Sequence, residues 1–136
     1  LETYTSATGV ARTAREFLEK SEQPSLLREL NAEKITSFDV FKAAEKGDEL
    51  ALDIFNYTGE ILGNACADFA TFNSPEAFVF FGLTKAGEYL MKPLRKAYED
   101  NVLFLYKGEG KQAKLLVSTL NGSEAAVLGA SALGWE

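Results

Sequence analysis

Residues 74–92 read SPEAFVFFGLTKAGEYLMK, and this stretch decides the fold. The unbroken apolar run 77–81 lies between Pro75 and Gly82, which is typical of a short strand covered on both of its faces. Gly82 then allows the backbone to turn sharply. Apolar residues follow at helical spacing, at Leu83, Ala86, Leu90 and Leu94. The segment therefore predicts a buried strand at 76–81, a tight turn and an amphipathic helix over residues 84–101.

The glycine turn allows two interpretations. A strand that passes through glycine into a helix N-terminus presents free N–H groups and the positive end of the helix dipole, which suits the phosphate or ribose side of a nucleotide. The same turn can instead serve the geometry of a strand–helix connection alone. Taken by itself, the segment favours the geometric interpretation without excluding the ligand site.

The order of the elements predicts a parallel sheet. A second strand is expected at 113–118, after a polar loop at 107–112. Strand, helix and strand in this order imply a parallel pair joined by a right-handed crossover. Further helices are expected at 1–20, 38–46, 49–72 and 124–133. Two strands cannot cover the apolar faces of these helices, so we expect the back half of an α/β domain whose other strands come from upstream sequence or a partner.

Residues 49–72 form the longest predicted helix, with Asp48 as its N-cap. The apolar positions of this helix form one stripe that should be buried. Gly59 and Gly63 interrupt the helix interior, where each costs about 1 kcal/mol relative to alanine. Either a neighbouring helix packs closely at these glycines or a ligand approaches the backbone, and the pattern leaves both open.

Composition excludes several classes of function. The chain has 136 residues, enough for one domain, and its 46% hydrophobic and 25% charged residues are ordinary for a soluble globular protein. The net charge of −6 argues against binding of nucleic acid or of an anionic membrane surface, because both need a basic patch. No apolar run approaches the roughly 20 residues of a membrane helix.

The histidine and cysteine counts narrow the chemistry further. The chain has no histidine, which excludes Ser-His-Asp and Cys-His sites and most zinc sites. Its single cysteine, Cys66, cannot form an internal disulfide and fits a reducing cytoplasm. Because Cys66 lies in a helical apolar pattern, we expect a small core residue rather than a reactive thiol. No metal ligand is predicted in this chain.

Five short motifs occur in a consistent order along the chain. They are Leu1-Glu2 followed by Ala7 and Gly9; residues 46–51 (KGDELA); Leu62-Gly63 leading to residues 73–76 (NSPE); Gly82 with Lys85, Ala86 and Gly87; and residues 128–130 (LGA) with Ala132. Together they resemble the ROK family of repressors, open reading frames and sugar kinases. Within the family, the sequence is most similar to bacterial glucokinases.

The resemblance implies an actin-like, hexokinase-like ATPase fold (ribonuclease H-like), α/β and helix-rich with a partial sheet, of which residues 1–136 are the C-terminal segment. It implies ATP with Mg²⁺ as phosphoryl donor, a hexose such as glucose as acceptor, a structural zinc bound upstream, a homodimer and a cytoplasmic location. Glu2 matches the glutamate that contacts a sugar hydroxyl in the family. The turn of Gly82, Leu83 and Thr84 matches the one that faces the adenosine. Considered apart from this resemblance, Glu2 is an acidic residue in the first turn of a helix, where the helix dipole stabilises its charge.

Two departures from the family pattern concern the nucleotide. The family's turn carries consecutive glycines where this chain has Gly82 alone, and the segment between Pro75 and Gly87 is one residue short. Both changes reduce the room for the adenosine. No residue matches the family's catalytic aspartate or phosphate loop, so this segment alone is not expected to transfer phosphate. The alternatives are the sugar-sensing domain of a ROK transcriptional repressor and a degenerate, non-catalytic ROK domain.

Overall fold

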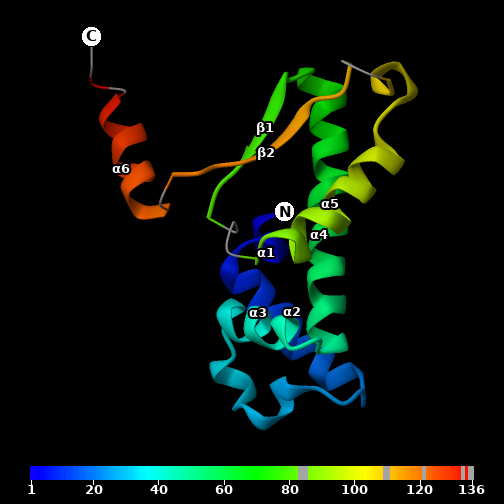
Figure 1. The fold of residues 1–136 in the computed structure, drawn as a ribbon, viewed down its shortest axis with the longest axis vertical. Helices are drawn as coiled ribbons and strands as arrows, with labels where there is room; N and C mark the ends of the chain where they lie inside the picture. Colours follow the sequence, from blue (N-terminus) through cyan, green and yellow to red (C-terminus); the bar gives the residue numbers. More distant parts are fainter. Residues whose placement is uncertain (83–85, 109–110, 121, 133, 135–136) are drawn as a thin grey trace.

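A long helix, α4, runs through the molecule, and a two-stranded parallel sheet lies beside its C-terminal half (Figure 1). The computed structural model describes residues 1–82, 86–108, 111–120, 122–132 and 134, with the backbone alone for 122–126. In chain order the elements are α1 (Glu2–Thr5), α2 (Ala7–Lys20), the 3₁₀ helices η1 (Leu26–Glu29) and η2 (Ala32–Lys34), α3 (Ser37–Glu45), α4 (Glu49–Asn73), β1 (Ala77–Phe80), α5 (Glu88–Asn101), η4 (Phe104–Tyr106, 3₁₀), β2 (Lys114–Val117) and α6 (Gly122–Ala132).

The two strands pair as the sequence predicts. β1 and β2 are parallel neighbours in a register that places Phe80 opposite Val117, and α5 lies between them in the chain. The prediction that 77–81 is covered on both faces is wrong, because Phe78 and Phe80 pack into the core whereas Val79 is 64% exposed. Side chains alternate between the faces of a strand, and within the described residues the helices cover one face of this sheet.

Helices α4 and α5 approach each other closely at two glycines of α4. An ideal Cβ on Gly59 would lie 2.6 Å from Cγ of Pro93. On Gly63 it would lie 2.7 Å from Cβ of Ala97 and would also overlap the carbonyl oxygen of Leu94. Both glycines therefore serve close helix packing, which decides between the two interpretations that the sequence leaves open.

Asp48 is the N-cap of α4, as predicted, and it also holds the loop before η1. Its Oδ1 accepts hydrogen bonds from the amide of Ala51 at 2.9 Å and the hydroxyl of Ser25 at 3.1 Å. Its Oδ2 accepts a hydrogen bond from the amide of Leu26 at 2.6 Å. A buried carboxylate with three donors is well satisfied, so Asp48 ties this loop to the start of α4.

The N-terminal segment forms two helices, and the prediction of a single helix over 1–20 is wrong. Ser6 has extended backbone angles (φ −83°, ψ 168°) and separates α1 from α2. The amide of Gly9 donates a hydrogen bond to the hydroxyl oxygen of Ser6 at 3.0 Å, so Ser6 is the N-cap of α2. The apolar spacing continues across Ser6, whereas the serine favours a new helix start.

The core has two parts. The first lies between α2, α3 and the N-terminal half of α4 and includes Val10, Leu27, Val40, Leu50, Ile54 and Phe55. The second joins the C-terminal half of α4 to α5 and the sheet, and it contains Cys66, Phe78 and Tyr98. The amide of Ala113 donates a hydrogen bond to the hydroxyl oxygen of Tyr98 at 3.2 Å, which holds the start of β2 against α5.

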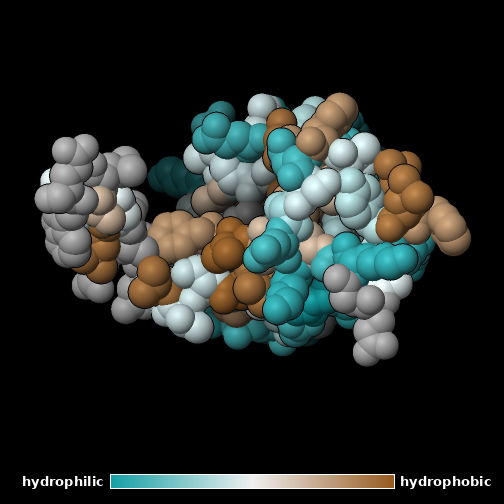
Figure 2. All heavy atoms as spheres, turned by 90° about the horizontal axis from the view of Figure 1, so that it is seen from above, coloured by the Kyte–Doolittle hydropathy of each residue, from teal (hydrophilic) through white to brown (hydrophobic). Residues whose placement is uncertain are grey.

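Exposed hydrophobic side chains include two groups on the sheet and in η4. Val79, Leu116 and Val117 are exposed on the sheet, and Phe104 and Leu105 are exposed in η4. Figure 2 looks down on this end of the molecule and shows hydrophobic side chains at its surface. Helix α6 stands apart from the other elements (Figure 1). None of the helices in the described part of the chain combines the length and apolar composition that a bilayer crossing requires.

We predict that Gly63→Ala destabilises the full-length protein by roughly 1–3 kcal/mol, because the added methyl group overpacks the contact between α4 and α5. Alanine is nevertheless the better helix former. Gly129→Ala is the matched control, since Gly129 also lies inside a helix but has nothing within 4 Å of an ideal Cβ. That control should be neutral or stabilising by up to ~1 kcal/mol. Urea denaturation measures both, and a stabilised Gly63→Ala variant would contradict the close contact.

Candidate functional site

An apolar cavity of about 310 Å³ lies at the carboxyl end of the two strands. Residues of α1, α4, α5, both strands and the segment after β1 line it: Thr5, Leu62, Val79, Phe80, Phe81, Leu90, Met91 and Val117. In parallel sheets, ligands bind outside the carboxyl ends of the strands. This edge of the sheet is therefore the first candidate for a functional site.

Gly82 directly follows Phe81, which lines the cavity. Its φ of +88° favours glycine, and no described residue other than its chain neighbours lies within 4 Å of the position of an ideal Cβ. Among the described residues, therefore, none blocks the approach of a ligand to the backbone at Gly82, and the adenosine contact stays a prediction. Leu83 and Thr84, the other predicted nucleotide contacts, lie outside the described residues. Helix α5 begins later than predicted, after the positive φ of Gly87 (+51°).

Glu2 is the first residue of α1, and its side chain is exposed. Among the described residues, its carboxylate has no hydrogen-bond or ion-pair partner. Helix α1 has four residues, so the helix dipole stabilises this carboxylate only weakly. The carboxylate is available to accept hydrogen bonds from hydroxyl groups of a ligand.

Aromatic and hydrogen-bond contacts hold α1 in place. The ring of Tyr4 lies between the guanidinium of Arg12, at 4.6 Å from the ring centroid, and the ring of Tyr57, at 6.3 Å between centroids. The hydroxyl of Thr5 donates a hydrogen bond to the carbonyl oxygen of Leu1 at 3.1 Å. Because Thr5 also lines the cavity, the contacts of α1 place this helix at the same edge of the sheet as the turn after β1.

The structure thus brings the elements of both predicted contacts to one cavity. Glu2 and Gly82 do not line it themselves; Thr5 and Phe81, from the same two segments, do. Sequence patterns did not mark Thr5, Leu62 or Met91 as lining residues of a site. Leu62 and Met91 are ordinary apolar positions of helices, and their meeting at the strand ends depends on how α4 and α5 cross.

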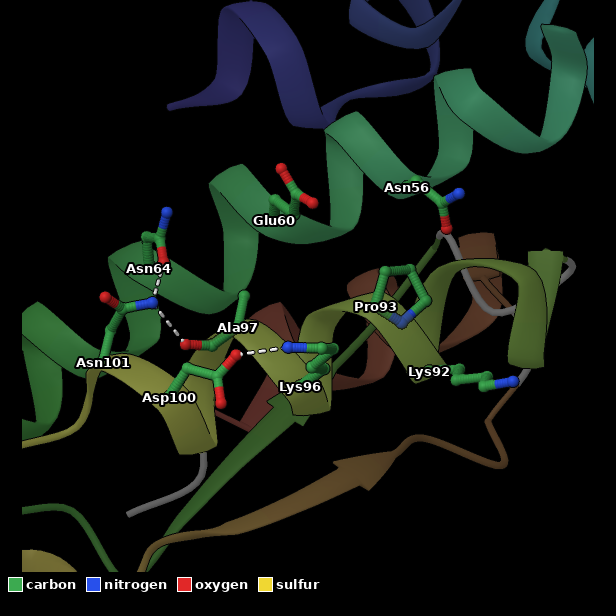
Figure 3. A pocket seen from close by; sticks show the side chains of 9 residues that line it. All are labelled: Asn56, Glu60, Asn64, Lys92, Pro93, Lys96, Ala97, Asp100 and Asn101. Carbon is green, nitrogen blue, oxygen red and sulfur yellow. Dashed lines mark hydrogen bonds and ion pairs between the residues drawn. The ribbon is translucent and has the colours of Figure 1, made fainter.

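A larger groove of about 550 Å³ lies between α4 and α5 (Figure 3). It is lined by Asn56, Glu60, Asn64, Lys92, Pro93, Lys96, Ala97, Asp100 and Asn101. Nζ of Lys96 lies 2.5 Å from Oδ2 of Asp100, and Nδ2 of Asn101 donates a hydrogen bond to Oδ1 of Asn64 at 2.8 Å. The hydrogen bond to Asp100 raises the pKa of Lys96. These polar groups bind one another and no predicted site residue lines the groove, which makes it the weaker candidate.

Cys66 is a core residue, as predicted. It is 3% exposed, and burial raises the pKa of its thiol to about 11, so the reactive thiolate is scarce at neutral pH. In the part of the chain that the structure describes, no three His, Cys, Asp or Glu side chains are grouped so that they could hold a metal ion.

Comparison with known proteins identifies the family. The sequence model described as ROK family matches residues 1–136, so the chain belongs to the ROK family. A glucokinase of Halalkalibacterium halodurans is 34% identical over 137 residues, which cover 99% of this chain and 39% of that protein. The predicted family is therefore confirmed.

Solved structures agree with this assignment. The structure of a ROK family glucokinase from Streptomyces griseus, in complex with glucose and AMPPNP, matches with a TM-score of 0.80 at 28% identity, over 97% of this chain and 43% of that one. A ROK family transcriptional regulator, a homolog of the E. coli MLC protein, matches with a TM-score of 0.72 at 25% identity, over 88% of this chain and 29% of that one. The chain has part of the actin-like ATPase fold of ROK sugar kinases, as predicted, and spans about two fifths of the length of the glucokinases it matches.

We predict that Cys66 of the folded protein reacts with iodoacetamide at pH 8 much more slowly than in urea, as measured by mass spectrometry of its peptide. The unfolded thiol ionises near pH 8.5 and the folded one near 11. The stability that this difference contributes is complete below pH 8.5 and is lost as the pH rises towards 11. Equal alkylation rates in the folded and unfolded protein would contradict the burial of Cys66.

Proposed function

We propose that the protein is an ATP-dependent hexose kinase with glucose as acceptor, and that residues 1–136 are the C-terminal portion of its ROK domain. The observation that carries the proposal is the match to glucokinases along nearly the whole chain, at 34% identity to one and with a TM-score of 0.80 to another. The latter was solved with glucose and AMPPNP. Homodimeric assembly and a cytoplasmic location belong to the same proposal.

The residues of this chain would bind and orient the two substrates. The Glu2 carboxylate accepts hydrogen bonds from a sugar hydroxyl, which fixes the sugar without charging it. The turn of Gly82, Leu83 and Thr84 faces the adenosine, and the open space beside Gly82 supports this role. ATP supplies the phosphoryl group, and its transfer depends on positioning and on charge stabilisation.

The remaining catalytic parts are assigned to other segments of the protein. No residue of this chain takes the role of catalytic base or phosphate loop, and we expect no phosphoryl transfer by residues 1–136 alone. As the family resemblance implies, we propose that the ligands of the Mg²⁺ that accompanies ATP and of a structural zinc lie upstream of these residues.

The second candidate function is sugar sensing in a ROK transcriptional repressor, supported by the match to the MLC homolog. That match has a lower TM-score and covers less of this chain than the match to the glucokinase. The third candidate is a degenerate, non-catalytic ROK domain. The single glycine of the turn supports it, because the family's turn carries consecutive glycines. A coupled assay of the full-length protein with glucose and ATP distinguishes the kinase from the repressor and from the non-catalytic domain. Only the kinase forms glucose 6-phosphate.

We predict that Glu2→Gln in the full-length protein lowers kcat/KM for glucose roughly 10–100-fold, because a charge-assisted hydrogen bond is worth about 1.5–3 kcal/mol. The KM for ATP should change less than about twofold, since Glu2 contacts the sugar alone. Glu19→Gln is the control, because Glu19 is an exposed carboxylate at the end of α2. Normal glucose kinetics of a folded Glu2→Gln variant would refute the role of Glu2.

We predict the reverse pattern for Gly82→Val. A β-branched side chain resists positive φ and fills the space beside the turn, so the KM for ATP should rise about tenfold or more while the KM for glucose stays within about twofold. Gly47→Val is the matched control. Gly47 also has a positive φ (+80°) and open space around an ideal Cβ, but it lies between α3 and α4. If both variants raise the KM for ATP equally, the turn has no specific contact with the nucleotide.

A further inference from the structure

We propose that Gly9 is a positioning residue for the hexose, because the absence of its side chain sets where α1 presents Glu2. The inference rests on the proposed function, since it assigns Gly9 a role in the glucose contact of that kinase. Gly9 would not touch the sugar; it would act through the backbone of α1.

Gly9 has no room for a side chain. An ideal Cβ on this residue would lie 2.6 Å from the carbonyl oxygen of Thr3 and 2.7 Å from the carbonyl carbon of Tyr4. Both atoms belong to the backbone of α1, which cannot move aside as a flexible side chain can. The backbone angles of Gly9 do not themselves require glycine, because it lies in α2 without a positive φ. Glycine is therefore needed here for the close approach of α1 to α2.

Contacts with α2, α4 and the cavity hold α1 on its other sides. The ring of Tyr4 packs edge-on against Tyr57 of α4 and beneath the guanidinium of Arg12. Thr5 is buried at the cavity. A methyl group at Gly9 has to push Thr3 from 2.6 Å to at least the 3.4 Å of an ordinary contact, so α1 would shift by about 0.8 Å against these neighbours.

The position of α1 matters to the sugar because this helix carries Glu2. The Glu2 carboxylate has no partner among the described residues, so the region that it can reach is set by the position of the α1 backbone. The amide of Ser6 donates a hydrogen bond to the carbonyl oxygen of Glu2 at 3.0 Å, which joins Glu2 to the junction that Gly9 packs against. A misplacement of about 1 Å at a substrate contact can cost about 100-fold in rate. A shift of α1 should therefore be felt as weaker binding of glucose and not of ATP.

The experiment is a double-mutant cycle in the full-length protein, with steady-state kinetics for glucose and for ATP. Gly9→Ala should lower kcat/KM for glucose roughly 10–100-fold and leave the KM for ATP within about twofold. In the Glu2→Gln background, Gly9→Ala should lower kcat/KM for glucose by less than about threefold. The reason is that the contact between residue 2 and the sugar, through which Gly9 acts, is already weakened. Gly59→Ala is the control for tight packing alone: an ideal Cβ there also meets an atom at 2.6 Å, but in α5. It should lower the Tm without a selective effect on glucose.

A second variant covers the case in which Gly9→Ala does not fold. Ser6→Ala removes the hydrogen bond that the hydroxyl oxygen of Ser6 accepts from the amide of Gly9, and it adds no atoms. This variant should raise the KM for glucose a few-fold in the wild-type background and not in the Glu2→Gln background. Three results would overturn the inference. They are additive effects of Gly9→Ala and Glu2→Gln on kcat/KM for glucose, equal effects of Gly9→Ala on the kinetics for glucose and for ATP, and unchanged glucose kinetics in a folded Gly9→Ala variant. A wild-type protein that does not phosphorylate glucose overturns the proposed function instead, so the two failures are distinguishable.

Discussion

The close contact between α4 and α5 is the constraint on which the rest of the structure depends. Gly59 and Gly63 remove the side chains that would keep the helices apart, and Pro93 and Ala97 fill the space. Since α5 connects β1 to β2, its position on α4 determines where the strands lie and which of their faces is covered. The cost of two glycines inside a helix, about 1 kcal/mol each, is offset by this packing.

The candidate site follows from the same arrangement. The strands end beside α4 and α5, and α1 reaches this edge because Tyr4 packs on α4 while Gly9 lets it lie against α2. Segments from opposite parts of the chain therefore border one apolar cavity, with Thr5 from one and Phe81 from the other. The proposed kinase would place the hexose on the side of α1 and the nucleotide on the side of the turn after β1.

Local patterns predicted much of the fold and less of the site. The apolar run before Gly82 predicted the first strand, and the N-cap Asp48 marked the start of the long helix. The order of the elements predicted that the two strands are parallel. Each of these features can be seen in neighbouring residues of the chain. The break at Ser6 is a local N-cap, which apolar spacing does not record. The cavity lining at Thr5 and elsewhere depends on contacts between segments that are distant in the chain. The face of β1 that carries Val79 was predicted to be buried, because an unbroken apolar run does not say how many layers cover it.

The central claim is that α1 and the turn at Gly82 contact the two substrates of one hexose kinase. The most direct measurement is a crystal structure of the full-length protein with glucose and AMPPNP. We expect a sugar hydroxyl within about 2.6–3.2 Å of the Glu2 carboxylate and the adenosine against the backbone of Gly82. Glucose bound away from α1, or a nucleotide bound away from the carboxyl ends of β1 and β2, would contradict it.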